Sequence, residues 1–234
     1  MDDNGLPKIS STSKTLGHFT PNWQGGITNT FRYKNLTFSF LFDASFGGKI
    51  FSNTNKTGLY TGVLAATLPG RDADHGGLWY YKNGDVNQQI DAPQYTMSSD
   101  GLYYATINGE QTRVYQDGII VDGVTASGEK NTKVVSAENY YHRLYSIAEA
   151  NVFDADYVKL REVSLTYQLP VKFVRKFHLQ DASVALTARN LWTIHKDAKD
   201  IDPEAAISSG NAQGVEAYTL PTTLQIGINL NVKF

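Results

Sequence analysis

The clearest pattern along the chain is a strict alternation of apolar and polar residues. In the last stretch, 224–234, every second residue is apolar, and the residues between them are Gln, Gly, Asn and Lys. A second run, 36–46, has the same period and carries no charge on its apolar side. Because successive side chains of a β-strand point to opposite faces, both runs predict strands with one apolar face.

Three further runs alternate less strictly and complete a predicted set of five strands. The first of them is separated from the run 36–46 by Lys34-Asn35 alone, which is β-hairpin spacing. The run that begins at Tyr157 ends at Pro170, which cannot continue a ladder of hydrogen bonds. The predicted strands are 22–33, 36–46, 157–169, 183–193 and 223–234.

The predicted connections are alternately short and long. The short ones are the turns 34–35 and 170–182, and the long ones are the segments 47–156 and 194–221. Tight turns at one end and large loops at the other are typical of a membrane β-barrel meander. The long segment predicts short strands at 103–107 and 113–115 and a helix over 136–144, and 171–178 predicts a short helical turn.

The length of the predicted strands bears on whether their apolar faces contact membrane lipid or a protein core. Eleven residues at about 3.3 Å each, tilted by about 45°, rise about 26 Å, close to the apolar band of about 25 Å on an outer-membrane barrel. Aromatic residues also gather near the strand ends: Trp23, Phe31, Tyr33, Phe46, Trp192 and Phe234. A soluble antiparallel sheet with one face on a core alternates equally well. The membrane interpretation would be wrong if a second layer of the chain covered Phe38, Phe40, Ile226 and Ile228.

Composition and charge exclude several classes of protein. The 234 residues include 21 basic and 23 acidic side chains and no cysteine. A nucleic-acid binder needs a basic excess or stripe, so we expect no nucleic-acid partner. Disulfides and thiolate metal sites are excluded, and no run of about 18 apolar residues predicts a transmembrane helix. Residues 1–7 are acidic and turn-like rather than a signal peptide, so we expect either a cytosolic chain or an internal fragment with its targeting segment upstream.

The sequence contains no enzyme signature. The five histidines never have the spacing of a zinc site, and no nucleophile elbow or phosphate-binding loop is present. We therefore expect no catalytic residue and no cofactor.

Two groups of residues are candidate binding sites. Aromatic side chains in the long segment offer flat faces on which sugar rings pack: Trp79, Tyr80, Tyr81, Tyr103 and Tyr104. Packing within the loop is the alternative for these residues. Carboxylates in the second loop are a weaker candidate for Ca²⁺, although their spacing is not that of an EF-hand: Asp197, Asp200, Asp202 and Glu204. A hydrated loop is the alternative there.

Eight segments of the chain carry a resemblance to a known family, and they occur in the family's order. They are PNWQGG (21–26), NTFRYK (29–34), NTKVVSAENYY (131–141), DYVKLREVSLTYQLP (156–170), ARNLWT (188–193), IDPE (201–204), GNAQGVE (210–216) and NLNVKF (229–234). In these segments the chain resembles the C-terminal portion of SusC/RagA-type TonB-dependent outer-membrane transporters.

The resemblance implies an all-β antiparallel meander that forms the last strands of a 22-stranded transmembrane barrel in the bacterial outer membrane. It implies import of oligosaccharides or peptides, a SusD-like surface lipoprotein as partner, contact with outer-membrane lipid, and TonB acting through an N-terminal part that this chain lacks. Phe234, with Val232 and Leu230, would be the signal read by the barrel-assembly machinery. The parity of the strands then places 47–156 and 194–221 outside the cell and 34–35 and 170–182 in the periplasm.

Two other functions stay open at this point. A soluble carbohydrate-binding β-module would be monomeric without detergent and would bind glycans. A passive porin or adhesin barrel would lack the plug and the TonB-contacting segment.

Overall fold

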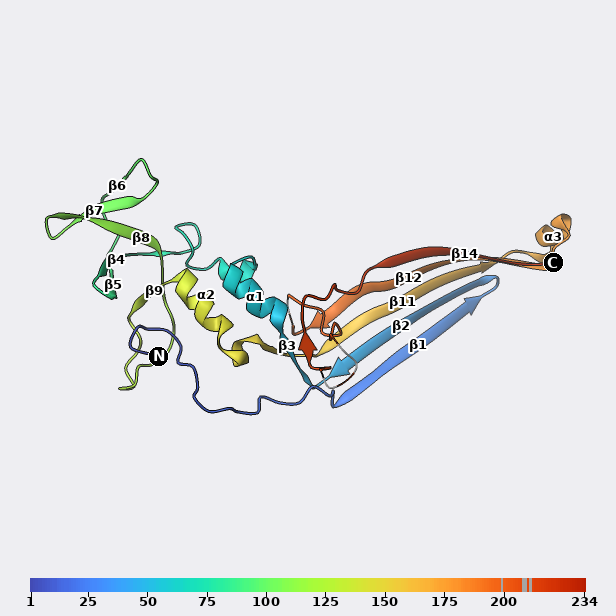
Figure 1. The fold of residues 1–234 in the computed structure, drawn as a ribbon. Helices are drawn as coiled ribbons and strands as arrows, with labels where there is room; N and C mark the ends of the chain where they lie inside the picture. The colour runs from blue at the N-terminus through green and yellow to red at the C-terminus, as the bar shows by residue number, and fades with distance from the viewer. Residues whose placement is uncertain (199, 208–209, 211) are drawn as a thin grey trace. The chain divides into compact units, whose positions relative to one another are not determined.

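A computed structural model describes residues 1–198, 200–207, 210 and 212–234, and it is built mainly of antiparallel β-sheets with few helices (Figure 1). This agrees with the predicted all-β class. The chain divides into two compact units: unit 1 is Met1–Thr15 with Asn53–Asn151, and unit 2 is Leu16–Ser52 with Val152–Phe234. Of the helices in the described residues, none is long and apolar enough to cross a membrane.

Unit 2 contains a long five-stranded sheet, with neighbouring strands in the order β1-β2-β11-β12-β14. All of its pairings are antiparallel. The strands are β1 (Trp23–Tyr33), β2 (Leu36–Phe46), β11 (Tyr157–Gln168), β12 (Asp181–Lys196) and β14 (Gln225–Lys233). They lie within three residues of the predicted bounds. The predicted second long loop also contains residues 199, 208, 209 and 211, which lie outside the described part.

The register of this sheet brings the apolar sides of all five strands to one face. One row across the sheet consists of paired apolar residues: Phe31, Phe38, Leu165, Leu186 and Ile228. The neighbouring row contains Phe40, whose ring lies 5.3 Å from that of Phe42 and 5.8 Å from that of Phe38. Residues directly opposite each other point to the same side of a sheet, so the face is continuous.

Among the described residues of its own unit, no second layer covers this apolar face. Phe38 is 36% exposed, Ile226 is 69% exposed and Ile228 is 75% exposed, while Phe40 is half-buried among its neighbouring rings. Apolar patches of this extent on a folded chain mark a surface that contacts something other than water.

The opposite face of the sheet is polar, and one strand contains a β-bulge. Leu160 pairs with Phe42 and Glu162 pairs with Leu41, so that Arg161 is the extra residue between them. Because of this insertion, Leu160 and Val163 lie on the same apolar face although they are three residues apart.

A small second sheet closes one end of unit 2. Its strands are β10 (Val152–Asp154), β3 (Lys49–Ser52) and β13 (Val215–Glu216), in that order, and β13 runs parallel to β3. Ile50 packs there against Ala198 and Ile201 in a small apolar core. The Oγ of Ser52 donates a hydrogen bond of 2.6 Å to Glu216, and both residues are buried.

The turn after β11 contains a short helical segment, as predicted for 171–178. It consists of α3 (Val171–Val174) and η3 (Arg175–Phe177), and His178 follows with φ 58°. Pro170 sits directly before α3, where its fixed φ suits a helix start.

Unit 1 contains a six-stranded sheet and two longer helices. The strands are β4 (Leu78–Asn83), β5 (Val86–Gln89), β6 (Tyr95–Met97), β7 (Tyr103–Ile107), β8 (Glu110–Ile120) and β9 (Val134–Ser136). The helical segments are α1 (Asn53–Thr61), η1 (Ala65–Thr67), α2 (Ala137–Tyr145) and η2 (Ala148–Asn151). Leu59 of α1 packs against Ala137 and Tyr141 of α2, and this contact is the core between the helices.

Candidate functional site

A cluster of charged side chains joins the polar face of the long sheet to the loop that follows β12. Lys159 Nζ lies 2.8 Å from Asp202 Oδ1 and 2.5 Å from Glu204 Oε2. Arg161 Nη2 lies 2.6 Å from Glu204 Oε1 and also contacts Asp43 of β2. We call these five residues the charge cluster.

Strand geometry explains why Lys159 and Arg161 act together. Residues two apart on a strand share a face, and the register places Asp43 directly opposite Lys159. Tyr157, two residues earlier, donates its hydroxyl to Glu204 at 3.0 Å. The start of β11 therefore presents a row of donors to the carboxylates of the loop.

Asp202 ties two parts of the loop together. Its second carboxylate oxygen accepts hydrogen bonds from Thr222 N at 3.0 Å and Thr222 Oγ1 at 2.7 Å. Burial raises the pKa of Asp202, but the hydrogen bonds from Lys159 and Thr222 outweigh burial, so the pKa lies well below its usual range. The pKa of Glu204 is lowered in the same way, because the bonds from Arg161 and Lys159 outweigh its burial.

Three of the four carboxylates proposed for Ca²⁺ lie beside Lys, Arg or His side chains. Asp202 and Glu204 contact Lys159 and Arg161, while Asp197 lies 3.3 Å from the ring of His195. In the part of the chain that the structure describes, no three His, Cys, Asp or Glu side chains are placed to hold a metal ion. Lys159 and Arg161 neutralise the carboxylates of Asp202 and Glu204, so this arrangement does not favour calcium at these two residues.

The predicted aromatic residues of unit 1 divide between the two faces of its sheet. Tyr81, Val114 and Tyr103 lie opposite one another across β4, β8 and β7. Trp79 joins the same face, because its ring centroid lies 5.5 Å from that of Tyr103. Tyr80 and Tyr104, each next in sequence to one of these residues, point to the other face.

Tyr95 completes a cluster on the first face. Its ring lies 4.8 Å from that of Trp79 and 5.0 Å from that of Tyr103, and its side chain is exposed. We call Trp79, Tyr95 and Tyr103 the aromatic cluster. Tyr95 is not among the predicted residues, and its one signal in the sequence is its place in the short alternating stretch 95–97.

The side chain of Tyr80 is packed in the interior of unit 1 rather than exposed on its surface. It is buried, and its ring is stacked at 5.1 Å on that of Tyr115. Burial raises the pKa of Tyr80 well above its ordinary value, and the nearby carboxylate of Asp117 adds to the rise. The alternative interpretation, packing within the loop, therefore describes this residue.

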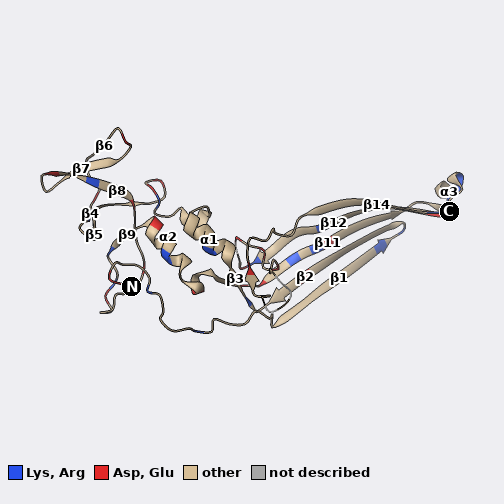
Figure 2. Cartoon of the chain, in the orientation of Figure 1, with Lys and Arg blue, Asp and Glu red and all other residues tan. Residues whose placement is uncertain are grey.

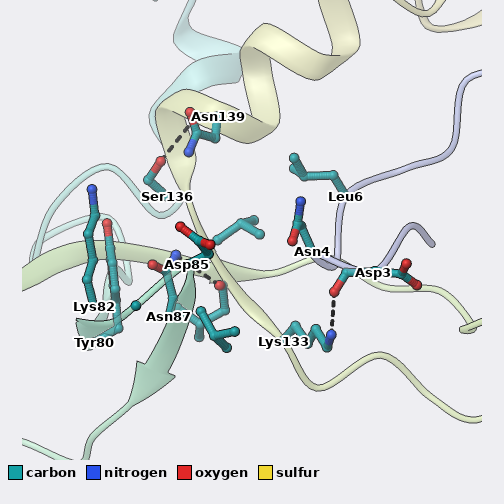
Figure 3. A pocket seen from close by; sticks show the side chains of 14 residues that line it. Asp3, Asn4, Leu6, Tyr80, Lys82, Asp85, Asn87, Lys133, Ser136 and Asn139 are labelled. Carbon is teal, nitrogen blue, oxygen red and sulfur yellow. Dashed lines mark hydrogen bonds between the residues drawn. The ribbon is translucent and has the colours of Figure 1, made fainter.

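Tyr80 also lines a polar hollow of about 320 Å³ in unit 1 (Figure 3). Lys133 donates there to the backbone oxygen of Asp3, and Asn87 Nδ2 donates to Val134 O at 3.1 Å. At the edge of the hollow, Ser136 caps α2 by accepting a hydrogen bond from Asn139 N at 3.2 Å. The contact between Lys133 and Asp3 holds the N-terminal residues beside this hollow.

The predicted assembly signal lies at the end of β14. Leu230 pairs with Val184 and Val232 pairs with Ala182, and Leu230 is exposed on the apolar face. Phe234 follows the strand and is exposed as well.

Comparison with known proteins identifies relatives over the whole chain. No family model matches it. Two curated proteins of Formosa agariphila match 100% of the chain: TonB-dependent receptor P3 at 27% identity and TonB-dependent receptor P26 at 25% identity. The chain spans 18% and 19% of their respective lengths.

A solved structure shows the same fold. The RagAB peptide importer in the closed-closed state matches 98% of this chain and 21% of its own chain, with a TM-score of 0.52 and 17% identity. Its open-open state also matches 98% of this chain and 20% of its own, with a TM-score of 0.48 and 16% identity. The relatives are described as receptors and an importer rather than as enzymes. The matches confirm the predicted resemblance to SusC/RagA-type TonB-dependent receptors, together with the predicted outer-membrane location.

Proposed function

Because the whole of this chain matches part of TonB-dependent receptors, we propose that it is the C-terminal portion of an outer-membrane importer of oligosaccharides or peptides. The observation that carries the proposal is the uncovered apolar face of the long sheet, which Phe38, Ile226 and Ile228 share. Side chains of this kind on strands of nine to sixteen residues suit the acyl chains of a bilayer.

The two outer strands of the sheet support a barrel that further strands complete. β1 and β14 each have one neighbouring strand, so each leaves one edge without a partner in the described sheet. An unpaired edge in lipid costs several kcal/mol for each unsatisfied backbone group. We therefore expect additional strands to pair with both edges, and the resemblance to SusC/RagA-type transporters implies 22 strands in the whole barrel.

Unit 1 and the loop after β12 would face the outside of the cell. In this arrangement the turns 34–35 and 170–182 lie in the periplasm, and Phe234, Val232 and Leu230 are read during barrel assembly. The aromatic cluster would contact the substrate or a SusD-like lipoprotein that covers it. TonB would act through a part of the protein that precedes this chain.

Two observations bear on the class of substrate. The aromatic cluster offers the flat apolar faces on which sugar rings pack, which favours oligosaccharides. RagAB is described as a peptide importer, which makes peptides the second class to test.

Uptake by cells that carry the full-length transporter tests the proposal. The probes are a radiolabelled mixture of oligosaccharides and a radiolabelled mixture of peptides, each with and without an ionophore that collapses the proton gradient. We expect ionophore-sensitive uptake of one mixture. Uptake that is unaffected by the ionophore would instead favour a passive barrel. If the protein is monomeric without detergent and binds glycans, a soluble module would be favoured.

Two variants connect uptake to the aromatic cluster. Tyr103→Ala should lower uptake by roughly two- to tenfold, because an aromatic contact is worth about 0.5–1.5 kcal/mol. Tyr104→Ala is the matched control, since this tyrosine lies on the opposite face of the same strand. Equal uptake by the two variants would remove the aromatic cluster from the substrate path.

A further inference from the structure

One end of the long sheet brings together three segments that are far apart in the sequence. The turn between β1 and β2 lies beside the end of β11, because Gln168 N donates to Asn35 O at 2.8 Å and Asn35 Nδ2 donates to Gln168 O at 2.9 Å. The end of β14 lies beside the start of β12, where Gln180 N donates to Lys233 O at 2.8 Å. α3, the β1–β2 turn and the C-terminus are therefore found at the same end (Figure 1). We call it the α3 end.

The side chains of the α3 end are strongly basic. The stretches 30–38, 164–184 and 229–234 contain six Lys and Arg residues: Arg32, Lys34, Lys172, Arg175, Lys176 and Lys233. Their one acidic side chain is Asp181, which accepts a hydrogen bond from Gln168. Figure 2 shows the basic residues on α3 and at the end of β1. This excess contrasts with the near balance of the whole chain.

Exposed apolar side chains accompany these charges. Val171 is 56% exposed, Phe173 49% and Phe177 61%, while Val174 between them is buried and holds the turn in place. The rings of Phe173 and Phe177 lie 5.3 Å apart and form one small apolar surface. A short turn that displays two phenylalanines beside three basic residues has the composition of a segment that lies in a membrane interface.

Tyrosines continue this surface onto the sheet. Tyr33 and Tyr167 both pair with Leu36, so they belong to the last row of the apolar face, and both are exposed. Tyr and Trp are enriched at the level of the lipid headgroups, where one end of the ring is apolar and the other is hydrated. The row marks the depth at which the acyl region would end. Five of the six basic residues lie beyond it, and Arg32 lies one residue before it on the polar face.

We propose that the α3 end is an interfacial anchor that binds anionic phospholipid headgroups of the periplasmic leaflet. Lys172, Arg175 and Lys176 would contact the lipid phosphates, while Phe173 and Phe177 enter the boundary between headgroups and acyl chains. Charge complementarity favours this occupant, since basic side chains near an anionic lipid surface each add to the attraction. The inference rests on the proposed function, because it requires the apolar face to lie in a bilayer.

The test uses the full-length transporter in nanodiscs that contain phosphatidylcholine and phosphatidylglycerol in a 4:1 ratio. The measurement is the enrichment of phosphatidylglycerol that stays bound to the protein after transfer to mild detergent, determined by mass spectrometry. The triple variant Lys172→Gln, Arg175→Gln, Lys176→Gln removes the charges of the turn. The matched control Lys8→Gln, Lys14→Gln, Lys130→Gln removes three exposed basic residues of unit 1.

We expect the wild type and the control to retain phosphatidylglycerol and the triple variant to retain at least about fivefold less, consistent with the attraction per basic residue. A charge-preserving variant, Lys172→Arg, Arg175→Lys, Lys176→Arg, should behave as the wild type. Equal retention by wild type and triple variant would overturn the inference. A triple variant that retains phosphatidylglycerol normally but fails to assemble would also overturn the inference, because that result would mean that the turn contacts a protein partner. A wild type that does not enter nanodiscs at all contradicts the proposed function itself.

Discussion

Lys159 connects the start of β11 to the loop after β12. Its side chain is almost fully buried, and it contacts two carboxylates of that loop. Removing one partner of a buried ion pair leaves a charge without compensation, and the energetic cost is far larger than for an exposed pair.

The first prediction therefore concerns Lys159→Met in the full-length protein. We expect the free energy of unfolding to fall by about 3–5 kcal/mol, measured by denaturant titration, and the loop to become sensitive to protease. Lys49→Met is the control, because Lys49 forms an exposed pair with Asp154 and should cost less than about 1 kcal/mol. Equal losses in the two variants would show that burial of the charge cluster contributes nothing.

A second prediction at this scale concerns acid. Because the pKa of Asp202 is lower in the folded protein than its ordinary value of 3.8, this group contributes stability that is fully present above that value. The contribution is lost as the pH falls below about 4 towards the folded pKa. The protection factor of the Thr222 amide, which is its hydrogen exchange corrected for the intrinsic pH dependence, should fall in this acid range and stay constant between pH 8 and 6, because this amide donates to Asp202. A fall in the protection factor between pH 8 and 6 would contradict the assignment.

At the scale of single elements, each strand of the long sheet has two sides that should respond differently to charge. Ile228 and Asn229 are neighbours on β14, and they point to the apolar and polar faces respectively. An arginine facing lipid costs about 2–4 kcal/mol near the bilayer midplane and much less towards the interface.

The third prediction compares Ile228→Arg with Asn229→Arg in the full-length protein. Ile228→Arg should reduce the amount of folded protein in the outer membrane, measured by heat-modifiable mobility on gels, whereas Asn229→Arg should leave it nearly unchanged. If Asn229→Arg were the more damaging substitution, the polar face would have to be the one that meets lipid.

Sequence pattern accounts for the long strands but not for the short ones. Strands of nine to sixteen residues repeat the alternation often enough to be recognised, whereas β13 has two residues and β10 has three. β8 was predicted only over 113–115, because its first residues, 110–112, are polar, and it spans Glu110–Ile120. The parallel pairing of β13 with β3 joins residues more than 160 positions apart, which no local pattern indicates.

The residues of the charge cluster and the aromatic cluster could be predicted from the sequence less completely than the long strands. Asp202 and Glu204 were recognised as an acidic pair, but their cationic partners lie on another strand more than 40 residues away. The bulge at Arg161 also interrupts the alternation at that point of β11. For the aromatic residues, the division of Tyr80 and Tyr81 between two faces follows from alternation alone once β4 is known.

At the scale of the whole molecule, the segment Asn53–Asn151 of unit 1 is inserted between two paired strands. Phe51 of β3 lies opposite Val152 of β10, so the chain leaves unit 2 and returns to it at neighbouring positions. A hairpin loop of three residues, Ser52 followed by Asn-Gly, can join antiparallel strands with this spacing.

The fourth prediction follows from this connection. Replacing 53–151 of the full-length transporter with Asn-Gly should leave outer-membrane assembly intact, measured by membrane fractionation and heat-modifiable mobility. Uptake of the radiolabelled probes should be lost, since the aromatic cluster is removed. A deletion variant that fails to assemble would show that unit 1 is required for folding of unit 2.

The adjacency of Phe51 and Val152 has a consequence for how such proteins diversify. The entropy needed to close a flexible loop rises only with the logarithm of its length, at about 0.6 kcal/mol for each doubling. An inserted domain could therefore double in size, or be exchanged for an unrelated one. The cost in free energy would be smaller than that of a single destabilising substitution in the barrel strands. Recognition can thus change by gain and loss of whole modules while the membrane scaffold keeps its sequence.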